Sequence, residues 1–196
     1  VMFCKKCVMS NQRPSYTGEF KYKSKSDRKS VIHFDEEGVC SACRFHDMKW
    51  NQIDWKERHR MLLELLDRHR SKDGSYDVIV PGSGGKDSTY VSHVLKYKYG
   101  MRPLTVTWPP HIYTEIGRKN FEAWLNTGVA NITFHPNNKL YRRLAREAFL
   151  NLLHPFQPFI VGQKQIGPKM ALKYGVKLIM YGESQGEAGA DINAAM

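Results

Sequence analysis

The fold is decided by the stretch YDVIVPGSGGKDSTYV, residues 76–91. Its apolar run ends at a proline, and a turn with three glycines, two serines, a lysine and an aspartate leads into a helical pattern. Glycines let main-chain N–H groups approach an anion, and the positive end of the following helix points at the same place. Lys86 adds a full charge, and Ser83 and Ser88 add hydroxyl groups. The stretch therefore predicts a strand–loop–helix junction that holds phosphate.

The spacing of this loop differs from the two common nucleotide-binding motifs. A Walker loop would need a glycine at Val80 and a hydroxyl residue at Asp87, and a dinucleotide fingerprint would need its third glycine at Asp87. A carboxylate among phosphates is repulsive unless a cation lies between them. Asp87 therefore predicts Mg²⁺ together with an outgoing pyrophosphate. The alternative is a glycine-rich turn that binds no ligand.

Strands and helices alternate through the second half of the chain. We expect strands over residues 77–80, 104–108, 131–136 and 177–183, and helices over residues 88–99, 118–126, 138–154 and 166–175. This order predicts an α/β fold, an open parallel sheet with helices on both faces. Ligands bind such sheets beyond the carboxyl ends of the strands, which is where the glycine-rich loop is expected.

All four cysteines fall in the first 43 residues as two C-x-x-C pairs: Cys4, Cys7, Cys40 and Cys43. Each pair can present two thiolates to one ion, and two pairs complete a tetrahedral zinc site. Two disulfides or four reduced thiols are the alternatives, and a cytoplasmic chain disfavours disulfides. A closed four-thiolate site has no open position for water, so we expect structural zinc without catalysis.

Three regions follow from these patterns. Residues 1–50 are expected to form a small zinc-binding module, residues 51–75 a linking amphipathic helix, and residues 76–196 the α/β domain, truncated at its C-terminus. The formal net charge is +11, and we interpret the basic segment 21–30 as a solvated loop in preference to a phosphate-tracking patch. No membrane span or signal-peptide pattern is seen, so we expect a cytoplasmic protein with no membrane partner.

The segment SGGKDS, Ser83 to Ser88, resembles the S-G-G-x-D-S signature of the PP-loop ATP pyrophosphatase superfamily, whose members cleave ATP between the α- and β-phosphates. The resemblance implies a Rossmann-like PP-loop domain over residues 76–196, with the backbone of residues 105–108 against adenine. It implies Lys86, Asp87 and Glu183 as catalytic residues, with Asp87 on Mg²⁺. The implied ATP-binding residues are Ser83, Gly84, Gly85, Lys86, Asp87, Ser88, Thr107 and Gly182.

Longer segments resemble the bacterial N-acetyl sugar amidotransferases, which act in the biosynthesis of lipopolysaccharide O-antigens, other surface polysaccharides and nonulosonic acids. The similar segments are C-x-x-C-V-M, GVCSAC, DVIVPGSGGKDSTYVSHVLK, LTVTW, LLHPFQPFIVGQ and MALKYGVKLIMYGES. The resemblance implies that ATP adenylates the acetamido oxygen of a nucleotide-activated N-acetyl sugar, and that ammonia then displaces AMP to leave an acetamidino group. It also implies two partners, a glutaminase subunit and a cyclase-like subunit that channels ammonia. Family members carry GEN and EYG where this chain reads GESQGEAG, with Ser184 and Ala188 as the differences.

Two other functions stay open. The zinc module and the charge also suit a tRNA-modifying PP-loop enzyme of the thiolation or lysidine type. No cysteine follows Cys43 to carry sulfur in the catalytic domain, so nucleic acid is the less favoured partner. The other alternative is an inactive zinc scaffold for a glutaminase complex.

A few residues outside the main motifs are also candidates. His111 and Tyr113 suit a sugar site and an exposed loop equally well, and Glu187 is a further candidate near the end of the chain. Phe156 and Phe159 are expected in the core.

Overall fold

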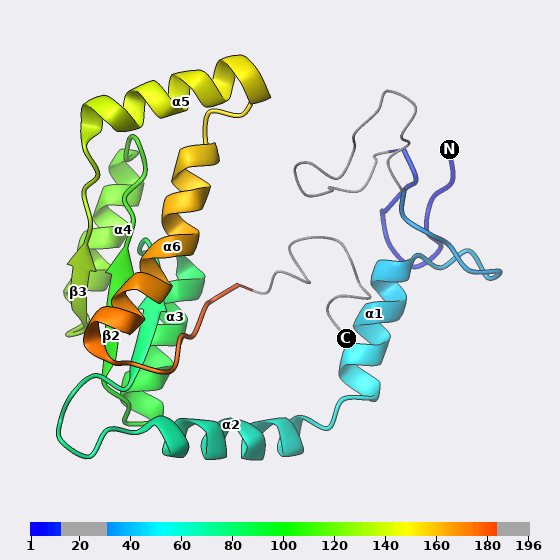
Figure 1. Cartoon of the computed structure of the whole chain (residues 1–196). Helices are drawn as coiled ribbons and strands as arrows, with labels where there is room; N and C mark the ends of the chain where they lie inside the picture. Colours follow the sequence, from blue (N-terminus) through cyan, green and yellow to red (C-terminus); the bar gives the residue numbers. More distant parts are fainter. Residues whose placement is uncertain (13–30, 184–196) are drawn as a thin grey trace. The chain divides into compact units, whose positions relative to one another are not determined.

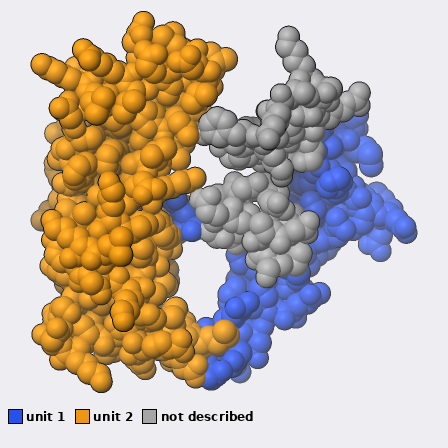
Figure 2. Space-filling view, in the orientation of Figure 1, with its two compact units in different colours: residues 1–60, 183–196 blue, residues 61–182 orange. Residues whose placement is uncertain are grey.

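The structure, a computed structural model, describes residues 1–12 and 31–183 of the 196-residue chain. The chain divides into two compact units (Figure 2). The described residues up to Arg60, together with Glu183, form the first unit, and residues 61–182 form the second. The basic segment 21–30 and the candidates at Ser184, Glu187 and Ala188 lie outside the described residues.

The first unit is built around the cysteines. Antiparallel bridges join Phe3 to Ser10 and Phe34 to Cys40, and helix α1 (Ser41–Asn51) begins directly after Cys40. Helix α1 was not predicted from the sequence, because it buries no residue and so has no marked apolar face. The buried cluster of this unit is small, since it consists of Cys4, Val39 and Cys40 with four partly buried neighbours, Cys7, Ile32, Phe34 and Cys43.

Helix α2 (Trp55–His69) crosses the division between the units. The Asp54 carboxylate accepts hydrogen bonds from the N–H groups of Lys56 and Glu57, which caps the first turn of α2. Leu66, near the other end of the helix, is 1% exposed and belongs to the core of the second unit.

The second unit contains a parallel sheet of three strands in the order β1-β2-β3: β1 (Val78–Pro81), β2 (Pro103–Thr107) and β3 (Ala130–Thr133). Ile79 pairs with Leu104, and Thr105 pairs with Asn131. Four helical segments complete the unit: α3 (Lys86–His93), continued by the π-helical turn η1 (Val94–Lys98), α4 (Glu115–Leu125), α5 (Asn138–Leu152) and α6 (Gln157–Tyr174). The predicted α/β fold with a parallel sheet is confirmed.

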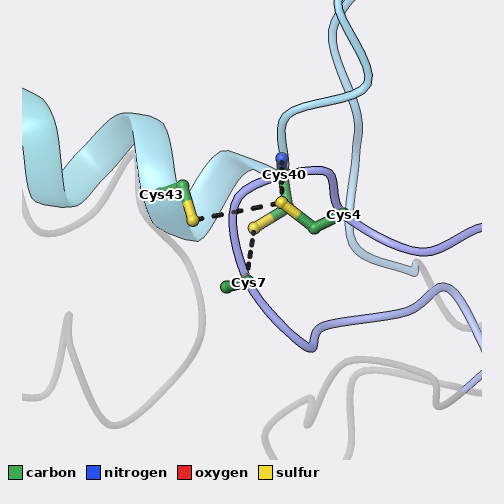
Figure 3. Close-up of side chains that lie close together, drawn as sticks. All are labelled: Cys4, Cys7, Cys40 and Cys43. Carbon is green, nitrogen blue, oxygen red and sulfur yellow. Dashed lines mark hydrogen bonds between the residues drawn. The ribbon is translucent and has the colours of Figure 1, made fainter.

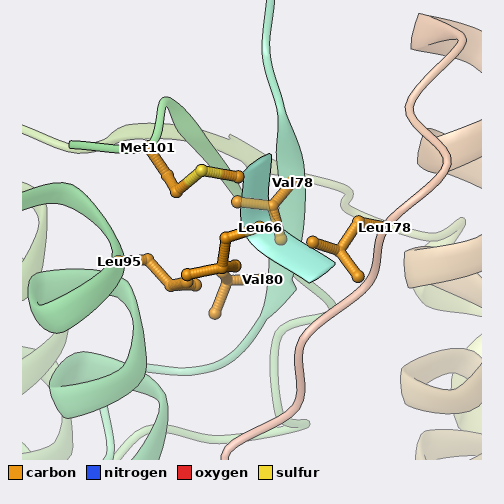
Figure 4. Close-up of a cluster of buried hydrophobic side chains, with 6 residues drawn as sticks. All are labelled: Leu66, Val78, Val80, Leu95, Met101 and Leu178. Atoms are coloured by element: carbon orange, nitrogen blue, oxygen red, sulfur yellow. The ribbon is translucent and has the colours of Figure 1, made fainter. Parts of the chain in front are cut away.

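Both faces of β1 and β2 are buried, and successive residues of β1 point to opposite sides of the sheet. On one side a cluster gathers around α2 and η1 (Figure 4): Leu66, Val78, Val80, Leu95, Met101 and Leu178. On the other side the sheet is covered by α6 (Figure 1), where Ile79, Leu104 and Val106 pack against Ile166 and Ala171. The helices therefore flank the sheet on both faces, as the sequence predicts.

The expected fourth strand forms only a bridge. Ile179 pairs with Ile79 in parallel, through hydrogen bonds from Ile79 N–H to Leu178 and from Met180 N–H to Ile79, each 2.9 Å long. The chain then turns away, so residues 177–183 do not make a strand of the sheet. This bridge lies on the opposite edge of β1 from β2, so β1 occupies an interior position.

Helix α6 starts nine residues earlier than predicted, at Gln157 in place of Ile166. One proline and two glycines made residues 157–167 resemble a turn. Pro158 falls in the first helical turn, where a missing N–H costs nothing. The glycines allow close packing, since a Cβ on Gly162 would lie 2.1 Å from the Trp108 indole and one on Gly167 would lie 2.8 Å from Pro81. In the described part of the chain, no helix is long and apolar enough to cross a bilayer.

Candidate functional site

The four cysteines converge in the first unit (Figure 3). Their Sγ atoms all lie within 4.8 Å of one another, with 4.0 Å between Cys4 and Cys43 and 3.7 Å between Cys7 and Cys40. Four sulfurs at 2.3 Å from one zinc ion, in a tetrahedron, would be about 3.8 Å apart. The cysteines therefore could bind a metal ion such as zinc, and all four predicted ligands are brought together.

Backbone hydrogen bonds hold the first pair in place. The Cys4 N–H donates to the Met9 carbonyl oxygen at 2.8 Å, which closes the loop that carries Cys7. The N–H groups of Lys6 and Cys40 each donate to Cys4 Sγ at 3.3 Å. Such N–H···S contacts stabilise a thiolate.

The thiol pKa values reflect this arrangement. Burial raises the pKa of Cys4, but the backbone N–H groups of Cys40 and Lys6 outweigh it and lower the pKa to about 6. The hydrogen bond with Cys7 raises the pKa of Cys43 to about 12. Metal ligation requires deprotonated thiols, so a bound cation would replace the thiol protons.

The glycine-rich loop joins β1 to α3 in the second unit. Gly84 has φ +82°, and a Cβ there would lie 2.6 Å from the Phe121 Cα of α4. A Cβ on Gly82 would lie 2.4 Å from that of Ser88. The fold therefore requires glycine at both positions. Gly85 differs, because its φ is −70° and a Cβ there would meet nothing within 4 Å.

Helix α3 begins directly after Gly85, at Lys86. Lys86 Nζ donates to both carboxylate oxygens of Asp87, at 2.6 and 2.7 Å; the Lys86 side chain is exposed and that of Asp87 is half-buried. Ser83 is half-buried, whereas Ser88 is buried and its hydroxyl donates to the Gly85 carbonyl oxygen at 3.3 Å. No side chain caps the N-terminus of α3, so the N–H groups of its first turn have no such partner.

The end of the bridge at Ile179 meets the same turn. A Cβ on Gly182 would lie 2.7 Å from the Asp87 carbonyl carbon and 2.9 Å from the Ser88 nitrogen. Because β1 is flanked by β2 on one edge and by residues 178–180 on the other, the strand order reverses at β1. Parallel sheets bind ligands at such reversals, outside the carboxyl ends of the strands. The loop and Gly182 occupy that position, and Glu183, which is exposed, follows in the chain.

Thr107 ends β2 with a fully buried side chain. Its hydroxyl accepts a hydrogen bond from the Asn131 amide at 3.1 Å, and its carbonyl oxygen accepts one from the Phe134 N–H at 3.0 Å. The Thr107 side chain is therefore already hydrogen-bonded within the sheet. The predicted ATP-binding roles of Thr107, Gly182 and the loop residues stay predictions.

The loop after β2 carries rings that pack inward. His111 stacks on Tyr141 with 4.1 Å between ring centroids, and Tyr113 lies 6.0 Å from Phe121. Both His111 and Tyr113 are half-buried, so neither is an exposed loop aromatic. The expected burial of Phe156 is wrong, because this side chain is 57% exposed at the turn before α6, whereas Phe159 is half-buried.

The rings of His111, Trp108, Phe134, Tyr141, Phe156 and Phe159 form a cluster, called the ring cluster below. Two residues of this region were not predicted from the sequence. Tyr141 and Gln157 lie on α5 and α6, more than 29 residues from His111, and nothing in their local sequence marks them. Tyr141 is 7% exposed and accepts a hydrogen bond from Trp108 Nε1 at 3.1 Å.

The chain matches no protein-family model, and no curated protein is significantly similar to it.

Proposed function

We propose that the chain is an ATP-dependent, AMP-forming amidotransferase of the PP-loop type. Its substrate is a nucleotide-activated N-acetyl sugar, and its product carries an acetamidino group. The observation that carries the proposal is the S-G-G-K-D-S loop, Ser83 to Ser88, which lies between β1 and α3 where the strand order reverses. The alternative of a glycine-rich turn without a ligand is less consistent with the geometry of Gly85.

The glycine at position 85 favours a ligand-binding loop over a tight turn that binds no ligand. Neither its φ nor its surroundings demand glycine, and serine or aspartate would be at least as good a cap for α3. A residue without a side chain at this position keeps the first turn of α3 open. Phosphate oxygens could then approach its N–H groups, which is the usual benefit of glycine beside an anion.

The side chains around the loop suit charge stabilisation. Lys86 is the nearest full positive charge to the start of α3, and its partner Asp87 provides the oxygen ligands that Mg²⁺ prefers. Bound Mg²⁺ would neutralise the charge of the departing pyrophosphate. Lys86 would then be released from Asp87 to contact a phosphate. Gly182 allows the chain to pass against Asp87 without a clash.

The proposed reaction needs positioning more than a nucleophilic side chain. The acetamido oxygen attacks the α-phosphorus of ATP, pyrophosphate leaves, and ammonia then adds to the amide carbon and displaces AMP. The protein's contribution is to align the two substrates and to stabilise charge at phosphorus. Glu183 remains a candidate contact for the metal or the sugar.

The ammonia source is proposed to be a partner. No cysteine follows Cys43, so the second unit has no thiol nucleophile for glutamine hydrolysis. A glutaminase subunit and a cyclase-like subunit that channels ammonia would supply it, in the cytoplasm where ATP and glutamine are present. We assign structural zinc to the cysteine cluster, because four thiolates leave no position for water.

The test is a coupled assay with the full chain. The protein is incubated with ATP, Mg²⁺, ammonium and either UDP-N-acetylglucosamine or UDP-N-acetylgalactosamine. We expect AMP in amounts equal to a sugar product that is lighter by the difference between an oxygen atom and an NH group. No AMP with any acetamido sugar would overturn the proposal. AMP formation that requires added tRNA would favour the tRNA-modifying alternative.

A further inference from the structure

The second unit contains buried polar atoms that no contact satisfies. Among the described residues, His111 Nε2, Tyr113 OH and Gln157 Oε1 are shielded from solvent and have no hydrogen-bond partner. An unpaired buried polar atom destabilises a fold, so such atoms are rare unless a ligand or water completes them. His111 and Tyr113 lie on the loop after β2, and Gln157 begins α6.

The surroundings of His111 are aromatic. His111 stacks on Tyr141 and lies 6.5 Å from Phe156 and 6.4 Å from Phe159, measured between ring centroids. Tyr141 contacts Trp108, which in turn stacks on Phe134 at 5.2 Å. Phe134 and Phe156 are 46% and 57% exposed, so the ring cluster reaches the surface. Aromatic walls with a few polar atoms are typical of small-molecule sites.

Tyr113 lies near the glycine-rich loop. Its ring lies 6.0 Å from that of Phe121, and the Phe121 backbone is the nearest neighbour that a Cβ on Gly84 would meet. Burial raises the pKa of Tyr113, so its hydroxyl remains an O–H donor at neutral pH. Burial lowers the pKa of His111, so its ring is neutral and carries one donor and one acceptor.

We propose that these residues form the binding site for the acetamido sugar, beside the ATP site. This inference rests on the proposed function. The unpaired atoms comprise a donor at Tyr113, an acceptor at Gln157 and a neutral imidazole at His111. An acetamido group offers one N–H and one C=O, and sugar hydroxyls both donate and accept. The C–H faces of a pyranose ring suit the aromatic walls.

Tyr113→Phe is the most specific test, because it removes the hydroxyl and little else. His111→Phe is its companion, and Tyr97→Phe is the matched control, since the Tyr97 hydroxyl donates to the Thr127 carbonyl oxygen and is therefore satisfied. Without any ligand, loss of an unpaired buried atom should raise Tm by about 2–4 °C in both test variants. The Tyr97→Phe variant should show no increase.

Binding is measured by calorimetry on the full chain with UDP-N-acetylglucosamine, UDP-N-acetylgalactosamine and, separately, a non-hydrolysable ATP analogue with Mg²⁺. We expect the sugar-nucleotide Kd to rise at least about tenfold in each test variant, because the partner group on the ligand then stays unpaired. The Kd for the ATP analogue should stay within about twofold of the wild-type value, and Tyr97→Phe should change neither affinity.

Several outcomes would overturn the inference. A lower Tm in both test variants would mean that the two atoms are already paired in the free protein. Weaker binding of the ATP analogue alone would assign the ring cluster to adenine. Wild-type protein that binds the ATP analogue but neither sugar nucleotide would remove the sugar assignment. Failure of the proposed function is separate, since it shows as wild-type protein that neither binds the ATP analogue nor forms AMP.

Discussion

Each of the two units of the chain is stabilised in a different way. In the first unit the buried cluster contains Val39 and two of the four cysteines, so the residues that would bind a metal are themselves the core. In the second unit two apolar clusters enclose the sheet, and Lys86 and Asp87 lie outside both. Where the ligand-binding residues are also the core, as in the first unit, their substitution should also unfold that unit. Where the site lies outside the core, as in the second unit, its residues can be substituted without loss of the fold.

The largest expected effect comes from metal removal. A strong zinc chelator should unfold the cysteine unit, because so small a cluster cannot offset the conformational entropy of its chain. Hydrogen exchange should show loss of protection at the Cys4 and Cys40 amides, while the amides of β1 and β2 stay protected. The Cys40→Ser variant should behave in the same way without chelator. Protection that survives both treatments would contradict the dependence on metal.

The second largest expected effect is a loss of activity without a loss of stability. Asp87→Asn should lower AMP formation by at least about 100-fold, because the proposed magnesium ligand loses its charge. Its Tm should stay close to the wild-type value, since Asp87 contributes to neither apolar cluster. Mass spectrometry of the intact protein under native conditions checks that zinc is retained. Full activity in this variant would show that the magnesium assignment is wrong.

Two adjacent glycines provide a matched pair. Gly84→Ser should reduce the free energy of unfolding by about 2–4 kcal/mol, because of its positive φ and the close approach of Phe121. Gly85→Ser should change it by less than about 0.5 kcal/mol, yet weaken ATP binding. Urea denaturation and calorimetry measure the two quantities. Equal destabilisation by both substitutions would contradict the distinction between them.

The smallest expected effect is at the surface of the cysteine unit. Lys6 Nζ lies 2.7 Å from Asp47, and the hydrogen bond lowers the pKa of Asp47. The contribution of this pair is present above the unfolded-state pKa and is lost as the pH falls below about 4. Because both side chains are exposed, Lys6→Gln should leave thermal unfolding at pH 7 almost unchanged. A large shift in Tm would mean that the pair supports the metal site directly.

Local patterns predicted much of this architecture. The C-x-x-C pairs anticipated the cysteine cluster, and the alternation of strands and helices anticipated the parallel sheet. Both signals depend on neighbours in the sequence. The first nine residues of helix α6 were not predicted, because Gly162 serves a contact with Trp108, which is distant in the chain. The stacking of His111 on Tyr141 spans 30 residues, and no periodicity reports such a contact.

The bridge between Ile79 and Ile179 also bears on how the protein is made. The two residues are 100 positions apart, so β1 and β2 can pair long before residues 178–182 have been synthesised. Pairings between distant segments form late, because a long loop must close first. During translation the glycine-rich loop is therefore complete only when Gly182 has left the ribosome and packed against Asp87. A nascent chain arrested before this point would have its sheet but not the expected nucleotide site.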